Sequence, residues 1–139
     1  MTLHQNKANL RRAAMAFNNR EERSAWFELH DESVEALGLG PEPLDKNGLR
    51  KFYQGLWRAF PDLHIDVEDL IGEGEMLAWR LQVTGTHKAE FRGVPPTGTE
   101  IEFSAHYFFR FRDGKIVERW TNFDRLGVMV QLGAIPSPV

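Results

Sequence analysis

The carboxylate of Asp124 is the group in this sequence best placed for acid–base chemistry. It ends the segment KIVERWTNFD, in which apolar and aromatic residues alternate with polar ones, as in a strand with one buried face. A carboxylate among aromatic rings is costly to ionise, so we expect its pKa to be raised toward neutrality, where proton transfer is most efficient. The alternative is structural, because an Asp just before a terminal helix often caps that helix.

The turn Asp113-Gly114 predicts which face of the sheet this strand presents. Asp-Gly between two alternating strands favours a two-residue hairpin, in which Arg112 pairs with Lys115. Cross-strand partners share a face, and we assign the more apolar face to the interior. That face would carry Phe103, Ala105, Tyr107, Phe109, Phe111, Ile116, Glu118, Trp120, Asn122 and Asp124. The assignment requires that no bulge lies between its ends, because a one-residue slip would turn Asp124 outward.

A second candidate for catalysis is His87, at the end of the segment TGTH. It could donate a hydrogen bond to a reacting enolate or orient Asp124; a turn histidine bonded to backbone is the structural alternative. His106 falls on the opposite face and is not a candidate. Glu118 is better explained as the salt-bridge partner of an arginine than as a catalyst, and Arg80 is left open as a pocket base or as that partner.

The walls of the expected pocket come from the inward aromatic face and from one helix. They are Tyr53, Trp57, Phe103, Tyr107, Phe109, Trp120 and Asn122. The rings could equally be ordinary core. The other histidines, His4, His30 and His64, have no spacing suggestive of metal ligation, so we expect no metal.

Helical patterns come first along the chain. Two amphipathic helices are predicted, from about Leu3 to Phe17 and over residues 20–29, followed by a short strand at 31–37 and a loop rich in Gly and Pro. The best-defined helix starts after a cap at Asp45 or Asn47 and ends at Pro61. Its apolar stripe is Leu49, Phe52, Tyr53, Leu56, Trp57 and Phe60.

Only strand patterns follow, over residues 63–71, 76–87, 100–112 and 115–124, before a short amphipathic segment at 125–133 that forms a helix or an extended lid. Helices followed by a strand meander predict one α+β domain over residues 1–139, with a curved antiparallel sheet.

Composition excludes several classes of function. The 139 residues contain no cysteine, which rules out disulfides, thiolate metal sites and a cysteine nucleophile. Net charge is -3 with basic residues scattered among acids, which argues against a nucleic-acid partner. We find neither the apolar stretch of a signal peptide nor a membrane-length apolar run, so we expect a cytoplasmic protein without a membrane partner.

The segment from about Asp45 to Gly133 resembles the SnoaL-like polyketide cyclases, or ester cyclases, of the nuclear transport factor 2-like superfamily. The resemblance rests on AFPDLHIDVEDLIGEGEMLAWR, TGTHKAEFRGVPPTGTEIEF, FRFRDGKIVERW and FDRLGVMVQLG. The block T-G-T-H followed by F-x-G-x-P-P-T-G is the specific part. The first 45 residues match in helical character alone.

This resemblance implies a cone-shaped α+β barrel with a deep apolar pocket, usually a homodimer, and no metal or organic cofactor. Family cyclases close a ring by intramolecular aldol condensation of a polyketide methyl ester. The aspartate of a W-x-x-x-D-x-x-G segment acts there as acid and base, and that position here is Asp124, between Trp120 and Gly127.

We therefore expect ring closure of a small apolar or polyketide-like ligand, with Asp124 at the floor of the pocket. An isomerase, an epoxide hydrolase and a non-catalytic binding protein remain alternatives on this fold. An isomerase would want a second inward acid, and a hydrolase would want an Asp-Arg-Asp set; the sequence offers neither.

Overall fold

The first helix, α1 (Leu3–Phe17), begins at a capping box and buries one face. The Thr2 hydroxyl accepts the backbone N–H of Gln5, and the Gln5 side chain accepts that of Thr2. In this computed structural model, which describes residues 1–138, Leu10 and Phe17 point into the core. The bounds of α1 match the prediction, and α2 (Ala25–Glu28) is a single short turn of the second predicted helix.

The third helix, α3 (Lys46–Ala59), carries the apolar stripe that the sequence predicts. Its cap is Asp45, whose side chain accepts the backbone N–H of Gly48 at 2.8 Å. Tyr53 and Trp57 are among the residues that it buries against the sheet. Pro61 follows the end of the helix, as expected.

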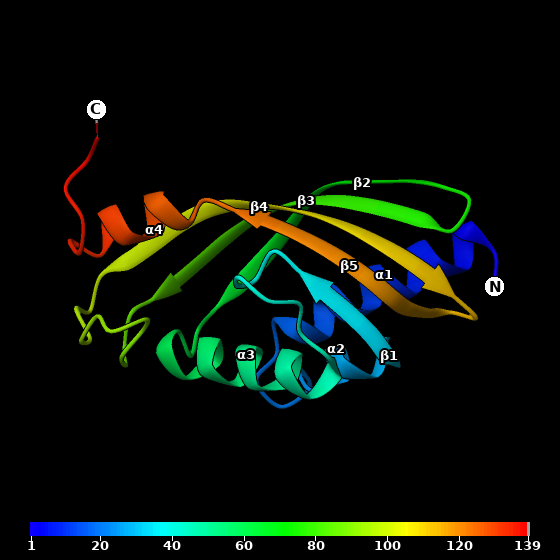
Figure 1. The fold of residues 1–139 in the computed structure, drawn as a ribbon, viewed down its shortest axis with the longest axis horizontal. Coiled ribbons are helices and arrows are strands. Elements are labelled where there is room, and N and C mark those ends of the chain that lie inside the picture. The colour runs from blue at the N-terminus through cyan, green and yellow to red at the C-terminus, as the bar shows by residue number, and fades with distance from the viewer. Residues whose placement is uncertain (139) are drawn as a thin grey trace.

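Five strands form one curved sheet: β1 (His30–Leu37), β2 (His64–Glu73), β3 (Met76–Thr86), β4 (Glu100–Arg112) and β5 (Lys115–Phe123). Their order is β1-β5-β4-β3-β2. All neighbours are antiparallel except β1 and β5, which are parallel. The predicted α+β fold is confirmed, although the sheet stays open rather than closing into a barrel (Figure 1).

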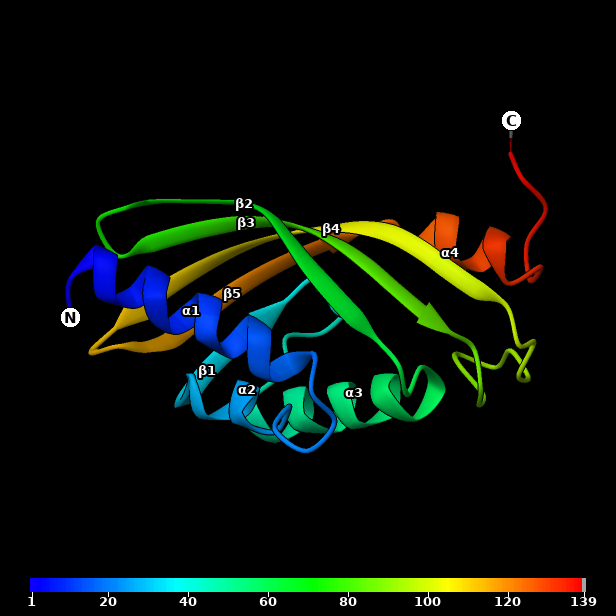
Figure 2. The ribbon, with the colours of Figure 1, turned by 180° about the vertical axis from the view of Figure 1, so that it is seen from behind.

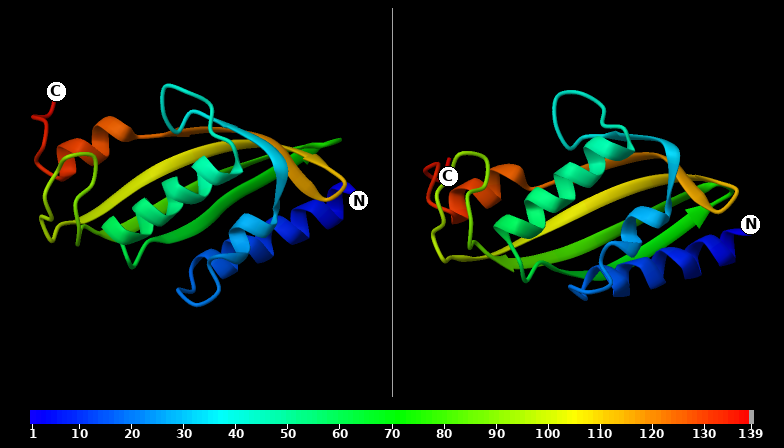
Figure 3. Two further views of the ribbon diagram at one scale, coloured as in Figure 1. Left: turned by 60° about the horizontal axis from the view of Figure 1, so that its bottom comes forward. Right: turned by 90° about the horizontal axis from the view of Figure 1, so that it is seen from below.

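The helices α1, α2 and α3 lie on the concave side of the sheet and leave its outer face uncovered by them (Figures 1 and 2). Seen from below, these helices lie in front of the strands (Figure 3). The chain ends with α4 (Arg125–Gln131) at one end of the sheet, so the last predicted segment is a helix. No helix among residues 1–138 is long and apolar enough to cross a membrane.

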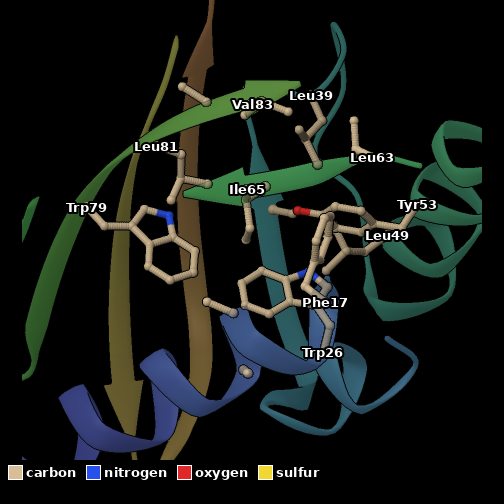
Figure 4. Packing of buried hydrophobic residues seen from close by; sticks show 14 of the residues in the cluster. Phe17, Trp26, Leu39, Leu49, Tyr53, Leu63, Ile65, Trp79, Leu81 and Val83 are labelled. Carbon is tan, nitrogen blue, oxygen red and sulfur yellow. The ribbon is translucent and has the colours of Figure 1, made fainter. Parts of the chain in front are cut away.

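Aromatic side chains fill the space between the helices and the sheet. Trp26 from α2 stacks on Trp79 of β3, with ring centroids 5.8 Å apart. Phe17 and Tyr53 bring further rings from α1 and α3 into the same cluster (Figure 4). This concentration of rings gives the inner face of the sheet its shape and its low polarity.

The hairpin between β4 and β5 contains a bulge that the sequence analysis did not place. The pairs Arg112–Lys115 and Phe111–Ile116 are as predicted. Val117 then has no partner, so Glu118 lies opposite Arg110 and the register is shifted from there onward.

The bulge reverses the predicted faces of the rest of β5. The inward side chains are those of Arg119, Thr121 and Phe123, of which Arg119 and Thr121 are buried. Glu118, Trp120 and Asn122 belong to the outer face, so their predicted interior position is wrong. The inward residues of β4 are as predicted, because they are aligned by β3 and by the turn.

Gly38 allows the loop after β1 to pass close to β5. Its φ is +89°, and a Cβ there would lie 2.1 Å from the carbonyl oxygen of Thr121. We expect Gly38→Ala to lower the free energy of unfolding by about 2 kcal/mol or more, because both the strained φ and the clash must be accommodated.

Urea unfolding measures this loss. The matched control is Gly40→Ala, since a Cβ at Gly40 meets nothing within 4 Å. The control should stay within about 0.5 kcal/mol of the wild type. Equal losses in the two variants would contradict the assigned role of Gly38.

Candidate functional site

A narrow cavity lies between α3, the inner face of the sheet and the start of α4. Its volume is about 40 Å³. That is room for a few water molecules, whereas ligand pockets usually measure about 300–1,000 Å³. A substrate-sized molecule would therefore have to push wall side chains apart.

The cavity wall is almost entirely apolar. It is formed by Phe17, Leu39, Phe52, Tyr53, Leu56, Phe60, Leu63, Ile65, Val83, Phe91, Phe103, Tyr107, Phe123 and Val128. Within this lining, the two tyrosine hydroxyls are the polar side-chain groups. Any directional recognition of a ligand by these side chains would run through Tyr53 and Tyr107.

Behind the two tyrosines lies Arg119, which is completely buried. Its Nη2 donates hydrogen bonds to the hydroxyl of Tyr53 at 2.8 Å and to that of Thr121 at 3.2 Å. Its Nη1 donates to Nε2 of His30 at 3.1 Å. The remaining donor, Nε, has no partner in the part of the chain that the structure describes.

Aromatic rings surround the guanidinium. Its Cζ lies 5.0 Å from the ring centroid of Tyr107, and the rings of Tyr53, Trp26 and Phe109 lie within 5.7 Å. Across residues 1–138, no Asp or Glu forms an ion pair with Arg119. Ring faces and neutral acceptors therefore stabilise this cation in place of a carboxylate.

His30 accepts from Arg119 as a neutral imidazole. Its Nδ1 lies 2.9 Å from the carbonyl oxygen of Trp26, which can only accept, so Nδ1 carries the proton and Nε2 is free to accept. Burial lowers the pKa of His30 well below 6.5, and the nearby charge of Arg119 lowers it further.

Tyr107 is held as a neutral phenol. Burial raises its pKa, and the neighbouring Tyr53 raises it further, which outweighs the opposite influence of Arg119. The phenol of Tyr107 is therefore available as a hydrogen-bond donor at the cavity.

Asp124 does not line the cavity. Its side chain is exposed and accepts the backbone N–H of Gly127 at 2.9 Å, which caps α4. The neighbouring Phe123 and Val128 do line the cavity, so Asp124 is near its wall. The structure therefore shows the capping alternative, and the acid–base role of Asp124 stays a prediction.

His87 is buried beside the cavity rather than in its lining. Its Nδ1 accepts the backbone N–H of Thr97 at 3.2 Å, and its ring packs on Phe60 with centroids 5.4 Å apart. This is the turn histidine that the sequence analysis kept as an alternative. Its Nε2 has no hydrogen-bond partner within residues 1–138.

The structure separates the other predicted pocket residues. Tyr53, Phe103 and Tyr107 come together in the cavity wall. Trp57 and Phe109 are buried in the core outside this lining. Trp120 and Asn122 are on the outer face, where the bulge has turned them.

The outer face also holds the charged residues that the sequence left open. Glu118 accepts from Arg110 at 2.8 Å, so it is the partner of an arginine, as predicted. Arg80 pairs with Asp69 at 2.7 Å, which is neither of the roles considered for it. His106 is exposed there, away from the cavity.

Arg119 was not predicted as a site residue, because a regular hairpin would turn it outward. A signal was present: Ile116 and Val117 are adjacent apolar residues and interrupt the alternation of β5. Both are buried, as expected where a bulge brings consecutive residues to one face.

The neutral state of buried His30 predicts a specific sensitivity to acid. Below about pH 6.5 the unfolded chain binds a proton at this residue that the folded chain does not, so stability should fall as pH drops. The contribution of His30 to this slope is at most about 1.4 kcal/mol per pH unit.

Urea unfolding at a series of pH values from about 7.5 to about 5 measures this slope. His30→Gln should flatten it, whereas the same substitution at the exposed His4 should leave it unchanged. An unchanged slope in the His30 variant would show that the imidazole takes up its proton without cost to the fold.

Solved structures with the same architecture include two from Streptomyces. AclR of Streptomyces galilaeus, a proposed hydroxylase, is 30% identical with a TM-score of 0.88, over 97% of this chain and 100% of that one. IdmH of Streptomyces antibioticus, a proposed polyketide cyclase, is 33% identical with a TM-score of 0.79, over 94% and 99%.

A proposed SnoaL-like polyketide cyclase from Jannaschia sp. CCS1 shares the fold, with a TM-score of 0.81, 23% identity and coverage of 96% and 94%. No curated protein matches the chain. The family model for the SnoaL-like polyketide cyclases matches residues 8–132, and the chain therefore belongs to that family.

Proposed function

We propose that this protein is a cyclase-like enzyme that closes a ring in a small, largely apolar, polyketide-like molecule without a cofactor. The observation that carries the proposal is the cavity, whose apolar wall ends at two tyrosine hydroxyls backed by a buried arginine. An apolar wall excludes water and favours folded conformers of a flexible substrate. The hydroxyls are suited to bind a carbonyl oxygen.

The proposed reaction is an intramolecular aldol addition. A general base removes a proton from the carbon between two carbonyl groups, the enolate carbon attacks a ketone of the same molecule, and the proton returns to the new alkoxide. One carbon–carbon bond forms and no net proton is consumed. Tyr53 and Tyr107 would donate hydrogen bonds to the oxygen on which negative charge develops.

The base in this proposal is Asp124, which the family resemblance supports. In the structure its carboxylate is engaged with Gly127 N–H, so it would have to turn toward the cavity beside Phe123. Widening of the cavity would accompany this turn. Leu39 and Phe91 are wall residues that lie on loops, outside the helices and strands, and movement of these loops would widen the cavity.

Asp124→Asn separates the catalytic role from the capping role. An amide caps a helix about as well as a carboxylate but does not take up a proton, so turnover should be lost while stability changes by no more than about 1 kcal/mol. Turnover of a polyketide-like substrate and urea unfolding are measured together.

The matched control is Asp45→Asn, because Asp45 caps α3 in the same way, through the N–H of Gly48. The control should retain turnover. Undiminished turnover in the Asp124 variant would remove the acid–base role and leave capping.

A non-catalytic binding protein is the second candidate, favoured because no Asp or Glu among the described residues 1–138 lines the cavity. Thermal stabilisation by polyketide-like and terpenoid compounds would detect binding under either candidate. The mass and the nuclear magnetic resonance spectrum of the product together then distinguish the chemistry. Aldol closure conserves the substrate mass or loses water, hydroxylation of the kind suggested by the likeness to AclR adds an oxygen atom, and a binding protein leaves the mass unchanged with the open chain intact.

We also propose that the outer face of the sheet forms a homodimer interface. By register, Ile71, Ala78, Phe108 and Trp120 lie side by side across β2, β3, β4 and β5. Ile71 is 66% exposed and Phe108 is 55% exposed.

Each side of this apolar stripe carries an ion pair, Asp69–Arg80 on one side and Arg110–Glu118 on the other. Both signs of charge therefore flank the stripe. A second copy related by a two-fold axis could place opposite charges together.

Phe108→Arg should convert the dimer to a monomer, because it places an unpaired charge at the centre of the stripe. Sedimentation velocity measures the mass of the species in solution and so distinguishes a dimer from a monomer. Met15→Arg is the control, since Met15 is 75% exposed on α1, away from the sheet face. A wild-type monomer, or a dimer that survives Phe108→Arg, would contradict this interface.

A further inference from the structure

Arg119 carries a buried positive charge that no residue among 1–138 neutralises with an ion pair. Removing an ion from water without a counter-charge costs several kcal/mol. In addition, its Nε–H has no hydrogen-bond partner within residues 1–138. The fold thus retains a cation whose burial is costly.

The guanidinium is directed toward the cavity. Arg119 is opposite Phe109 in the sheet, and Thr121 is opposite Tyr107. Because Arg119 donates to the Thr121 hydroxyl, its side chain runs along β5 toward the row of Tyr107. It therefore ends behind the two tyrosines that line the cavity.

The hydrogen bond between Arg119 and Tyr53 restricts where the tyrosine proton can go. The Tyr53 oxygen accepts from Nη2, so its own O–H must donate elsewhere. A charge-assisted bond of this kind also makes the hydroxyl a stronger donor. The neighbouring Tyr107 hydroxyl interacts with Tyr53, and an oxygen atom of a ligand in the cavity that both residues line would be a further acceptor.

The other ionisable groups near Arg119 do not supply an anion. His30 from β1 is neutral and accepts from the guanidinium, and Tyr107 from β4 is a neutral phenol. Lys46 lies beyond His30 and pairs with the exposed Glu32. The position left for a negative charge is therefore the cavity side of the tyrosines.

We propose that the cavity binds 1,3-dicarbonyl compounds as their enolates, with the oxyanion at Tyr53 and Tyr107 and with Arg119 as the positioning residue that supplies the balancing charge. On binding, the C–H bond between the two carbonyls breaks, its electron pair stays in the enolate, and its proton goes to solvent. This rests on the proposed function and deepens it by naming the buried group that balances the charge of the enolate.

Benzoylacetone, a simple aryl 1,3-diketone, is the probe, because its enolate differs from its neutral forms in ultraviolet absorbance. The apparent pKa of the bound probe is measured by titrating wild-type protein in excess over the diketone. The wild type should lower that pKa by about one unit or more, which corresponds to about tenfold tighter binding of the enolate than of the neutral forms.

Arg119→Met should abolish the lowering of the apparent pKa of the bound diketone, and Tyr53→Phe should reduce it. Arg119→Lys should keep part of the lowering that Arg119→Met loses. Arg80→Met is the matched control, because Arg80 is half-exposed in an ion pair on the outer face. Circular dichroism and thermal unfolding establish that each variant is folded. If Arg119→Met does not fold, the variants Tyr53→Phe and Arg119→Lys still test the proposal.

A wild-type protein that does not bind the diketone, or that binds it without lowering its pKa, would overturn the proposal. So would an unchanged pKa in the Arg119 and Tyr53 variants. Failure of the enolate-binding proposal is distinguishable from failure of the cyclase function. Ring closure is measured separately, from the mass and structure of the product of a longer substrate. If the protein closes a ring but does not prefer the enolate of the diketone, the cyclase function stands and the proposed role of Arg119 is wrong.

Discussion

The single unpaired residue Val117 in β5 determines what the protein places beneath its helices. Before it, the hairpin follows the register set by Asp113-Gly114; after it, every side chain of β5 is on the face opposite to that of a regular hairpin. In a regular hairpin, Glu118 would lie among the aromatic rings and Arg119 would be in solvent. The bulge instead buries Arg119 and leaves Glu118 outside, where it pairs with Arg110.

From that position Arg119 connects elements that are far apart in the sequence. Tyr53 reaches it from α3, His30 from β1 and the ring of Tyr107 from β4. The same tyrosines form part of the cavity wall, so the buried charge and the apolar pocket belong to one arrangement. The chain belongs to the SnoaL-like polyketide cyclase family, and the aldol chemistry proposed for it, in which a carbonyl oxygen gains negative charge, would draw on this arrangement.

Much of the fold could be predicted because the relevant signals are local. Helical spacing located α1 from Leu3 to Phe17, and alternation located β4 from Glu100 to Arg112. The start of α3 was placed at Asp45 or Asn47, and Asp45 is the cap. The bulge was missed because its position depends on packing against β1 and the helices. The adjacent pair Ile116–Val117 was its one local trace.

The candidate site was harder to predict, because it depends on the directions in which side chains point and not only on residue types. The spacing of Asp124 suited both a cap and an inward carboxylate, and the structure shows the cap. Tyr53, Phe103 and Tyr107 lie together in the cavity wall because they are on segments before the bulge or outside β5, and their role in binding a substrate stays a prediction. The width of the cavity could not be predicted, since it is set by where α3 and the loops come to rest on the sheet.

Nuclear magnetic resonance of the arginine side chains tests the central claim, the inward position of Arg119, most directly. The account predicts an Arg119 Nε–H signal that is protected from exchange with water and shows nuclear Overhauser contacts to the rings of Trp26, Tyr53 and Tyr107. A rapidly exchanging Arg119 signal, with those contacts made by the side chain of Trp120 instead, would show a regular hairpin and contradict the account.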